Sequence, residues 1–501
     1  MKRAHFWPLA LAGSVLCSSA SFAQYALDLL QLSRFEPVGS ARTTALGGSF
    51  VALGADWGGA SSNPAGIAGF HSSVLGLSAS MGSVGSHSDY LNNRTRSSRG
   101  DVRIPALGIV IAEKPQESGS GWMRVHYGFT LNQTAVYSGR WQLDGFNNKT
   151  SLVQYFQEEA NSGSAFVAAQ FPFSAALAAR TGLIYPERPG DSTSYYFSIV
   201  PSGGVRQEEE ARSNGQMSDY QFTLAGNWKN MIQLGASLSI LSARFDRFSS
   251  FTESDEADSI FDFKSLRYTQ NIYSVADGFE WKLGAIFKPS DFFRLGFSYV
   301  PPSRLTVEED FQTDLEATFD SVPTYAFASS PVFAPFVYKF RRPARTSVGL
   351  AMVFPKKGLI SAGYDYMSFQ RMRVRTEGLD AGTSEWARGV NSDVRNLLQS
   401  TSTFRFGAEG LLGPYALRMG MAYTTTPFVA ELNTGGGNRA QREVSMGGGY
   451  RKDPFILDVC ITNRSWNVYH EPYSLSIPAP NFGASIRQFR TELILSLGMR
   501  F

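Results

Sequence analysis

The chain has 501 residues, a formal net charge of +3 at pH 7 and a mean hydropathy of −0.16. A charge this close to zero provides no basic surface for nucleic acid. The slightly negative hydropathy, with no apolar run long enough to span a bilayer as a helix, excludes a helical membrane protein. Aromatic residues at 13% and 48 glycines are compatible with a membrane β-barrel.

The first 23 residues have the pattern of a secretory signal peptide. Lys2 and Arg3 form a basic start, an apolar stretch covers Phe6–Leu16, and Ser21-Phe22-Ala23 is a small-residue cleavage site. We therefore expect export and a mature chain that starts at Gln24. Cys460 is then the one remaining cysteine, so neither disulfides nor a cysteine-based metal site are expected, and we predict no metal and no cofactor.

Residues 24–72 are predicted to form a short helix followed by a compact plug. Tyr25–Phe35 has leucines at helical spacing. The segment Gly39–Gly69 is rich in glycine and alanine, whose small side chains let backbones pack closely. Near its end stands the turn-forming sequence Asn63-Pro64-Ala65.

Residues 73–501 alternate apolar with small or polar side chains, segment after segment. The last segment has Leu493, Leu495, Leu497, Met499 and Phe501 on one face. About fourteen such segments, most of them roughly 9–12 residues long, predict an all-β fold, a transmembrane antiparallel β-barrel. Their expected starts are residues 74, 102, 122, 218, 231, 270, 292, 344, 358, 402, 414, 441, 454 and 490.

The connections alternate between tight turns and long polar loops. The long loops are expected near residues 137–217, 302–340, 374–400 and 468–488, and this asymmetry is typical of a barrel with short periplasmic turns and long external loops. In the first loop, residues 152–160 have helix-forming composition and residues 166–183 are rich in Ala and Phe. This loop either folds on itself or forms an apolar platform that first receives a hydrophobic ligand.

Alternation places several charged side chains in the lumen, among them Arg124, Arg405 and Arg418. These arginines either form internal ion pairs with lumen carboxylates or meet a ligand carboxylate, because arginine suits bidentate carboxylate binding. No histidine stands in a recognisable nucleophile motif, so we do not expect an enzyme.

Several of these features together resemble the outer-membrane long-chain fatty-acid and hydrocarbon transporter family, the FadL/TodX/OMPP1 group. The resemblance rests on Asn63-Pro64-Ala65, on the lead-in 40–52, on Ile104-Pro105-Ala106-Leu107-Gly108, on Phe404–Glu409 and on the terminal strand with Phe501. The lead-in is similar to branches from Bacteroidetes-like bacteria. The resemblance implies fourteen strands, an N-terminal hatch inside the lumen, and a kinked third strand that opens a lateral exit. Gly128 is the residue of the third segment best suited to such a distortion.

We therefore predict a monomeric outer-membrane channel of a Gram-negative bacterium for hydrophobic small molecules such as long-chain fatty acids. The hatch would gate the channel, with lateral release into outer-membrane lipid, and Phe501 would be recognised by the barrel assembly machinery. An alternative with the same fold is a surface component that binds secreted cargo proteins in a secretion system. No nucleic acid partner is expected.

Overall fold

A computed structural model describes residues 19–114, 121–162, 168–200, 202–322, 325–377, 380–429, 439–476 and 482–501. The expected signal peptide, residues 1–23, lies largely outside the described residues. Within the described ranges no helix combines the length and apolarity needed to cross a membrane.

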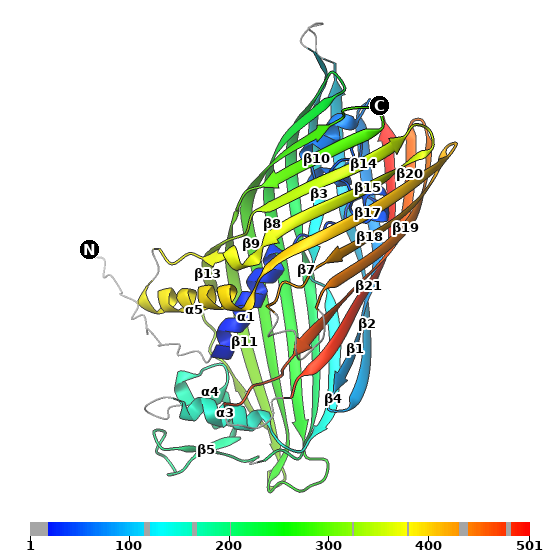
Figure 1. The fold of residues 1–501 in the computed structure, drawn as a ribbon. Coiled ribbons are helices and arrows are strands. Elements are labelled where there is room, and N and C mark those ends of the chain that lie inside the picture. Colours follow the sequence, from blue (N-terminus) through cyan, green and yellow to red (C-terminus); the bar gives the residue numbers. More distant parts are fainter. Residues whose placement is uncertain are drawn as a thin grey trace, which may run out of the picture.

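The chain forms a closed antiparallel β-barrel of fourteen strands, as the alternation predicts (Figure 1). Closure occurs where β1 pairs with β21, from Val74 opposite Arg500 to Asp89 opposite Ser485. The strands are β1 (Val74–Tyr90), β2 (Asn93–Glu113), β3 (Trp122–Val136), β7 (Val205–Trp228), β8 (Ile232–Ser254), β9 (Phe263–Phe287), β10 (Phe293–Val300), β14 (Arg345–Phe354), β15 (Gly358–Ser368), β17 (Ser400–Leu412), β18 (Tyr415–Thr424), β19 (Gln441–Lys452), β20 (Phe455–His470) and β21 (Ala484–Arg500).

Shorter elements extend the wall beyond these strands. The strand β11 (Arg304–Phe319) continues the path of β10 along β9 and pairs with β12 (Ala326–Ser329) and β13 (Phe336–Arg341). β4 (Gly139–Asn147) pairs with β7, and β16 (Arg373–Val374) pairs with β13. The remaining elements are α3 (Leu152–Asn161), η3 (Ala168–Gln170), α4 (Ala175–Thr181), β5 (Ile184–Pro186), β6 (Tyr196–Ser198), η4 (Phe369–Arg371) and α5 (Ala381–Leu397).

Several strands are much longer than the predicted 9–12 residues, and parts of the predicted loops belong to them. β9 has 25 residues and β7 has 24. Within the predicted loops 137–217 and 302–340, β4, β11 and β13 are strands. The extra length carries polar residues on both faces, so the lipid-type alternation that marks the other segments is absent there.

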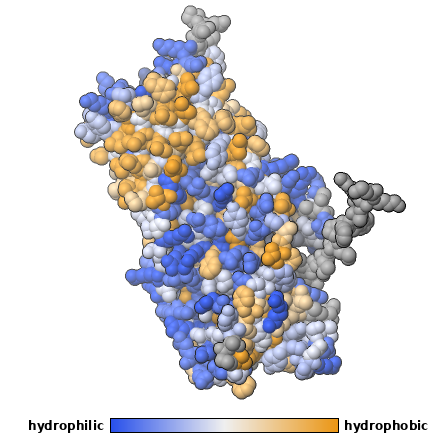
Figure 2. Space-filling view, turned by 180° about the vertical axis from the view of Figure 1, so that it is seen from behind, coloured by the Kyte–Doolittle hydropathy of each residue, from blue (hydrophilic) through white to orange (hydrophobic). Residues whose placement is uncertain are grey.

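The outer surface is apolar over one half of the barrel and polar over the other (Figure 2). Leucine, phenylalanine and methionine side chains form the apolar band, for example Leu77, Leu238, Phe297, Met419 and Leu495. The band lies toward the end that carries the short turns and the C-terminus, which we call the turn end. The opposite, loop end carries α3, α4 and the long connections (Figure 1). A band of this kind is the surface that a bilayer requires of a barrel.

The N-terminal segment lies inside the barrel (Figure 1). α1 (Ser19–Ser33) packs against α5, and the chain then runs toward the turn end through α2 (Ala41–Ala45), η1 (Gly58–Ser61) and η2 (Pro64–Gly69). We call residues 39–70 the hatch. Nearly all its residues are buried, although it contains little regular structure.

Candidate functional site: a hatch and an apolar chamber inside the barrel

Asn63 ties the hatch to the barrel wall. Its side-chain oxygen accepts a hydrogen bond from the Ala65 amide at 3.0 Å, which caps η2, while Pro64 occupies the first turn, where no amide donor is needed. Its amide nitrogen donates to the Val51 carbonyl at 2.6 Å and to the carbonyls of Ala285 and Phe297 on β9 and β10, at 3.2 and 3.3 Å. One asparagine thus closes the turn and fixes it to two strands.

A second polar centre holds the rest of the hatch together. Asp56 accepts hydrogen bonds from the hydroxyls of Ser40 (2.6 Å) and Thr43 (3.0 Å) and from the Gly58 amide (2.8 Å). Ser40 also caps α2. A buried carboxylate with three donors fixes loops that no regular hydrogen-bond ladder connects.

The wall approaches the hatch so closely that it has room only for glycine at many positions. A Cβ on Gly235 would lie 2.5 Å from the Ala65 amide, and one on Gly284 would overlap the Asn63 side chain. Trp57 lies against a further set of strands, where its ring covers Gly76, Gly108 and Gly498. The wall glycines in contact with the hatch are Gly76, Gly108, Gly128, Gly235, Gly284, Gly296, Gly349, Gly363, Gly407, Gly420, Gly447 and Gly498. Backbone-to-backbone packing around the barrel leaves the hatch firmly seated.

Two of the three arginines singled out in the sequence lie in internal ion pairs. Arg418 binds Glu409 and Asp458, at 2.5 and 2.6 Å. Arg42 of the hatch shares Glu409 at 3.3 Å. Arg405 pairs with Asp365 at 2.8 Å and donates to the Gly47 carbonyl of the hatch at 3.2 Å. These guanidiniums therefore link wall and hatch.

Arg124 and Gly128 lie apart from that network. The Arg124 guanidinium is 3.3 Å from the ring of His71, in an exposed position. Gly128 pairs regularly with Val110 and Thr223 and contacts Ile67 of the hatch. The pairing of β3 with β7 shifts register elsewhere, on either side of Met123 and of Thr134. The pairing at Gly128 is thus regular, and a kink that opens a lateral exit stays a prediction.

Above the hatch, toward the loop end, apolar side chains surround α1. Ala26, Leu29, Leu30 and Leu32 of α1 are buried there. The ring of Trp386 on α5 lies edge-on to Tyr25, with centroids 5.1 Å apart, and contacts Phe336 and Tyr338. We call this region the chamber; its wall includes Met217, Leu241, Phe245, Leu305, Val307, Tyr338, Phe340, Met372, Val390 and Phe428. In this structure α1 fills it.

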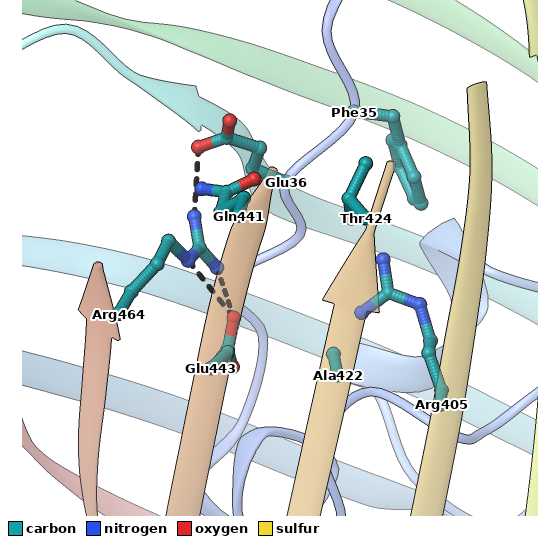
Figure 3. Close-up of a pocket in the computed structure, with 8 residues that line it drawn as sticks. All are labelled: Phe35, Glu36, Arg405, Ala422, Thr424, Gln441, Glu443 and Arg464. Carbon is teal, nitrogen blue, oxygen red and sulfur yellow. Dashed lines mark hydrogen bonds and ion pairs between the residues drawn. The ribbon is translucent and has the colours of Figure 1, made fainter. Parts of the chain in front are cut away.

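A small polar pocket lies beside the segment that joins α1 to the hatch (Figure 3). Arg464 lies between Glu36 and Glu443, at 2.7 Å from each carboxylate, and Phe35 and Arg405 line the opposite side. Glu36 also joins β3, because its amide donates to the Thr134 carbonyl at 2.7 Å. The segment between α1 and the hatch is thereby fixed to the shifted part of β3.

Sequence reasoning missed Arg345, a buried arginine beside the chamber. Its guanidinium lies 3.2 Å from the centroid of the Phe35 ring and donates to the Ser61 carbonyl at 3.0 Å, and Nε has no hydrogen-bond partner. Among the described residues no carboxylate forms an ion pair with it. In the sequence, Arg345 stands at the start of the strand expected at residue 344, and nothing there distinguishes it from the other residues expected in the lumen.

At the loop end, α3 and α4 pack on their own apolar core over β8, β9 and β11. Glu253 of β8 fixes α3 by accepting from the Ser151 hydroxyl at 2.5 Å and the Leu152 amide at 2.8 Å. Burial raises the pKa of Glu253 to about 7. This cap supports the first alternative for the loop, that it folds on itself, yet Tyr185 and Phe197 of β5 and β6 remain exposed.

No protein-family model matches the chain, and no curated protein matches its sequence. Solved structures do match its fold. A FadL homologue of Pseudomonas aeruginosa aligns over 94% of this chain and 100% of its own, with a TM-score of 0.55 and 13% identity. The toluene transporters TodX of Pseudomonas putida and TbuX of Ralstonia pickettii align over 94% of this chain and 99% and 100% of theirs, both with TM-scores of 0.48, at 14% and 12% identity.

The chain therefore has the fold of a FadL-type barrel. At 13% identity this likeness defines the fold and not the ligand. The Bacteroidetes-like branch stays a prediction from the sequence.

Proposed function

We propose that this protein is an outer-membrane channel for the uptake of hydrophobic small molecules such as long-chain fatty acids. The observation that carries the proposal is an apolar cluster around α1, with the closely packed segment 39–70 between it and the turn end, inside a barrel with an apolar outer band. An open porin needs the apolar outer band, but it has no need of an internal apolar cluster or of a packed segment in its lumen. With the short turns in the periplasm, the chamber lies on the external side of the hatch.

In this proposal the ligand takes the place of α1 in the chamber. Burying an apolar chain there recovers about 25 cal/mol for each Å² removed from water, which offsets the loss of the α1 contacts. The tightly seated hatch then leaves a sideways route as the natural exit, because a straight path would require all of its wall contacts to break.

The place that fits a lateral exit is the divergence of β2 from β3. Their pairing runs only from Ala106 opposite Asn132 to Glu113 opposite Val125. Just beyond it, the pairing of β1 with β2 shifts register next to Pro105, which has no amide donor. Here residues 93–105 of β2 reach β4 through side chains, as in the 3.0 Å bond from the Ser97 hydroxyl to the Arg140 carbonyl.

The proposal is tested by bound lipid and by uptake. The full-length barrel, purified in mild detergent, is expected to carry a hydrophobic ligand identifiable by mass spectrometry. Cells that express it are expected to take up labelled fatty acid faster than cells that lack it. No bound hydrophobe and unchanged uptake would contradict the proposal.

The exposed aromatic residues of β5 and β6 favour one second candidate, a surface component that binds secreted cargo proteins. Co-purification of specific secreted proteins, abolished by replacing Tyr185 and Phe197 with serine, together with unchanged fatty-acid uptake, would support this candidate over transport.

A further inference from the structure

We propose that the outer face of β11, β13 and β16 binds the phosphate groups of an outer-leaflet glycolipid. Three arginines stand side by side there, because Arg304 pairs directly with Arg341, and Arg341 with Arg373. We call them the arginine row. Like charges directly opposite each other destabilise a sheet, so an anion bound along the row would relieve this repulsion.

No such anion comes from the described part of the chain. None of the three arginines forms an ion pair there; Arg373 donates to the carbonyls of Gln370 and Met372, at 2.8 and 2.6 Å. Asp277 on the neighbouring strand β9 and Glu308 farther along β11 are exposed on the same face, and neither pairs with the row. Burial and the nearby Arg395 of α5 lower the pKa of Arg373.

The row lies at the boundary of the apolar band. Arg304 is opposite Phe279 on β9, whose side chain is 67% exposed, and Phe279 pairs with exposed Ile240 on β8. From there the band continues along β9 toward the turn end through Trp281 and Leu283. Away from the apolar band, the outward-facing residues next to Arg304 and Arg341 along their strands are polar.

Apolar side chains next to a cationic row match a lipid whose acyl chains carry a phosphorylated headgroup. Arginine forms bidentate, charge-assisted hydrogen bonds with phosphate, and each basic residue near a charged lipid surface adds about 1 kcal/mol of attraction. The inference rests on the outer-membrane location in the proposed function, with the loop end outward, and not on transport itself.

Binding of lipid A provides the test. The purified barrel in detergent is titrated with bisphosphorylated lipid A, and bound lipid is counted by native mass spectrometry. We expect the variant Arg304→Gln/Arg341→Gln/Arg373→Gln to bind roughly 100-fold more weakly than the wild type, from three charges at about 1 kcal/mol each. Arg267→Gln is the matched control, because Arg267 is exposed on the neighbouring strand β9 and already pairs with Glu316 at 3.5 Å; it is expected to bind like the wild type.

Two further arms separate the sources of the anion. Dephosphorylated lipid A is expected to bind the wild type as weakly as the triple variant, and millimolar inorganic phosphate is expected not to displace lipid A. Equal retention of both lipids, or displacement by free phosphate, would overturn the proposal. Heat-modifiable electrophoretic mobility verifies that each variant is folded. No transport ligand enters the assay, so its outcome is independent of whether uptake occurs.

Discussion

Arg345 carries a buried positive charge into the barrel, only 4% of it is exposed, and no carboxylate of the described ranges forms an ion pair with it. The face of the Phe35 ring and the Ser61 carbonyl stabilise the guanidinium in part. Because Phe35 directly follows α1, movement of α1 out of the chamber would also uncover Arg345. A ligand that replaces α1 would thus meet a guanidinium with a free donor and no ion-pair partner among the described residues, whereas Arg405 and Arg418 are ion-paired with wall carboxylates.

We expect Arg345→Gln to reduce uptake of a fatty acid while sparing a neutral hydrocarbon of equal chain length. A charged hydrogen bond contributes about 1.5–3 kcal/mol, so the loss in affinity for the carboxylate should be roughly 10- to 100-fold. Binding of both ligands to the purified protein measures the difference. An equal loss for the two ligands would mean that Arg345 acts only on the structure.

Gly284 allows Asn63 of the hatch to lie directly against the wall, because a glycine has no Cβ that would overlap the Asn63 side chain. We expect Gly284→Ala to displace Asn63, with a loss of about 1–3 kcal/mol in stability from overpacking. The melting temperature and the bilayer current carried by the variant are the measurements. Gly410→Ala is the control, since nothing lies within 4 Å of a Cβ at that position of β17. Similar behaviour of the two variants would contradict the close seating.

At the scale of elements, α1 has one face in the chamber and one outside it. Leu30 is 1% exposed and Leu27 is 41% exposed. Leu30→Ala removes about 2–5 kcal/mol of packing, so α1 should leave the chamber more readily and a fluorescent fatty acid should bind more tightly. Leu27→Ala should bind like the wild type. Weaker binding by Leu30→Ala would show that α1 forms part of the ligand site and does not compete for it.

The attachment of α3 to β8 is expected to depend on pH through Glu253. Burial raises its pKa from the usual value of 4.5 to about 7, so the attached state holds the proton more tightly than the detached state. The extra stability is complete below pH 4.5 and is lost as pH rises through about 7. Hydrogen exchange of the α3 amides, corrected for intrinsic rates, should therefore be slower at pH 5 than at pH 8. Glu253→Gln should remove this difference.

The sequence predicted the fold well because a bilayer imposes a two-sided environment on every strand that crosses it. The alternation in β18 and β21 follows directly from that constraint. The polar extension of β7 beyond the apolar band lacks it and lies within the predicted loop 137–217, and β9 begins before the predicted start at residue 270. The state of Arg345 depends on which lumen side chains face one another across the barrel, which is a property of strand register that a single sequence does not carry. The glycines of the wall can be read from the sequence. Their common role, contact with the hatch, is recognisable only once the path of the hatch through the barrel is known.

At the scale of the whole molecule, we expect hatch and barrel together to determine whether the lumen conducts. A barrel of fourteen strands is too wide for its own side chains to fill, and the hatch occupies the turn-end half. Wall glycines on most of the fourteen strands, from β1 round the barrel to β21, contact the hatch. Deletion of residues 40–70, bridged by a short Gly-Ser linker, should convert a barrel with little ion current into an open pore.

Single-channel recording in planar bilayers measures this change. The wild type and Gly410→Ala should show little current, Gly284→Ala should show brief openings as its hatch shifts, and the deletion should show large, steady conductance. A wild type that already conducts as well as the deletion variant would mean that ions pass beside the hatch, and a gated route for hydrophobic ligands would then need another barrier. If current appears only when the hatch is removed or displaced, the close packing of the hatch against the wall also closes the barrel in a membrane. The proposed transport would then have to move either the hatch itself or the ligand sideways past the hatch.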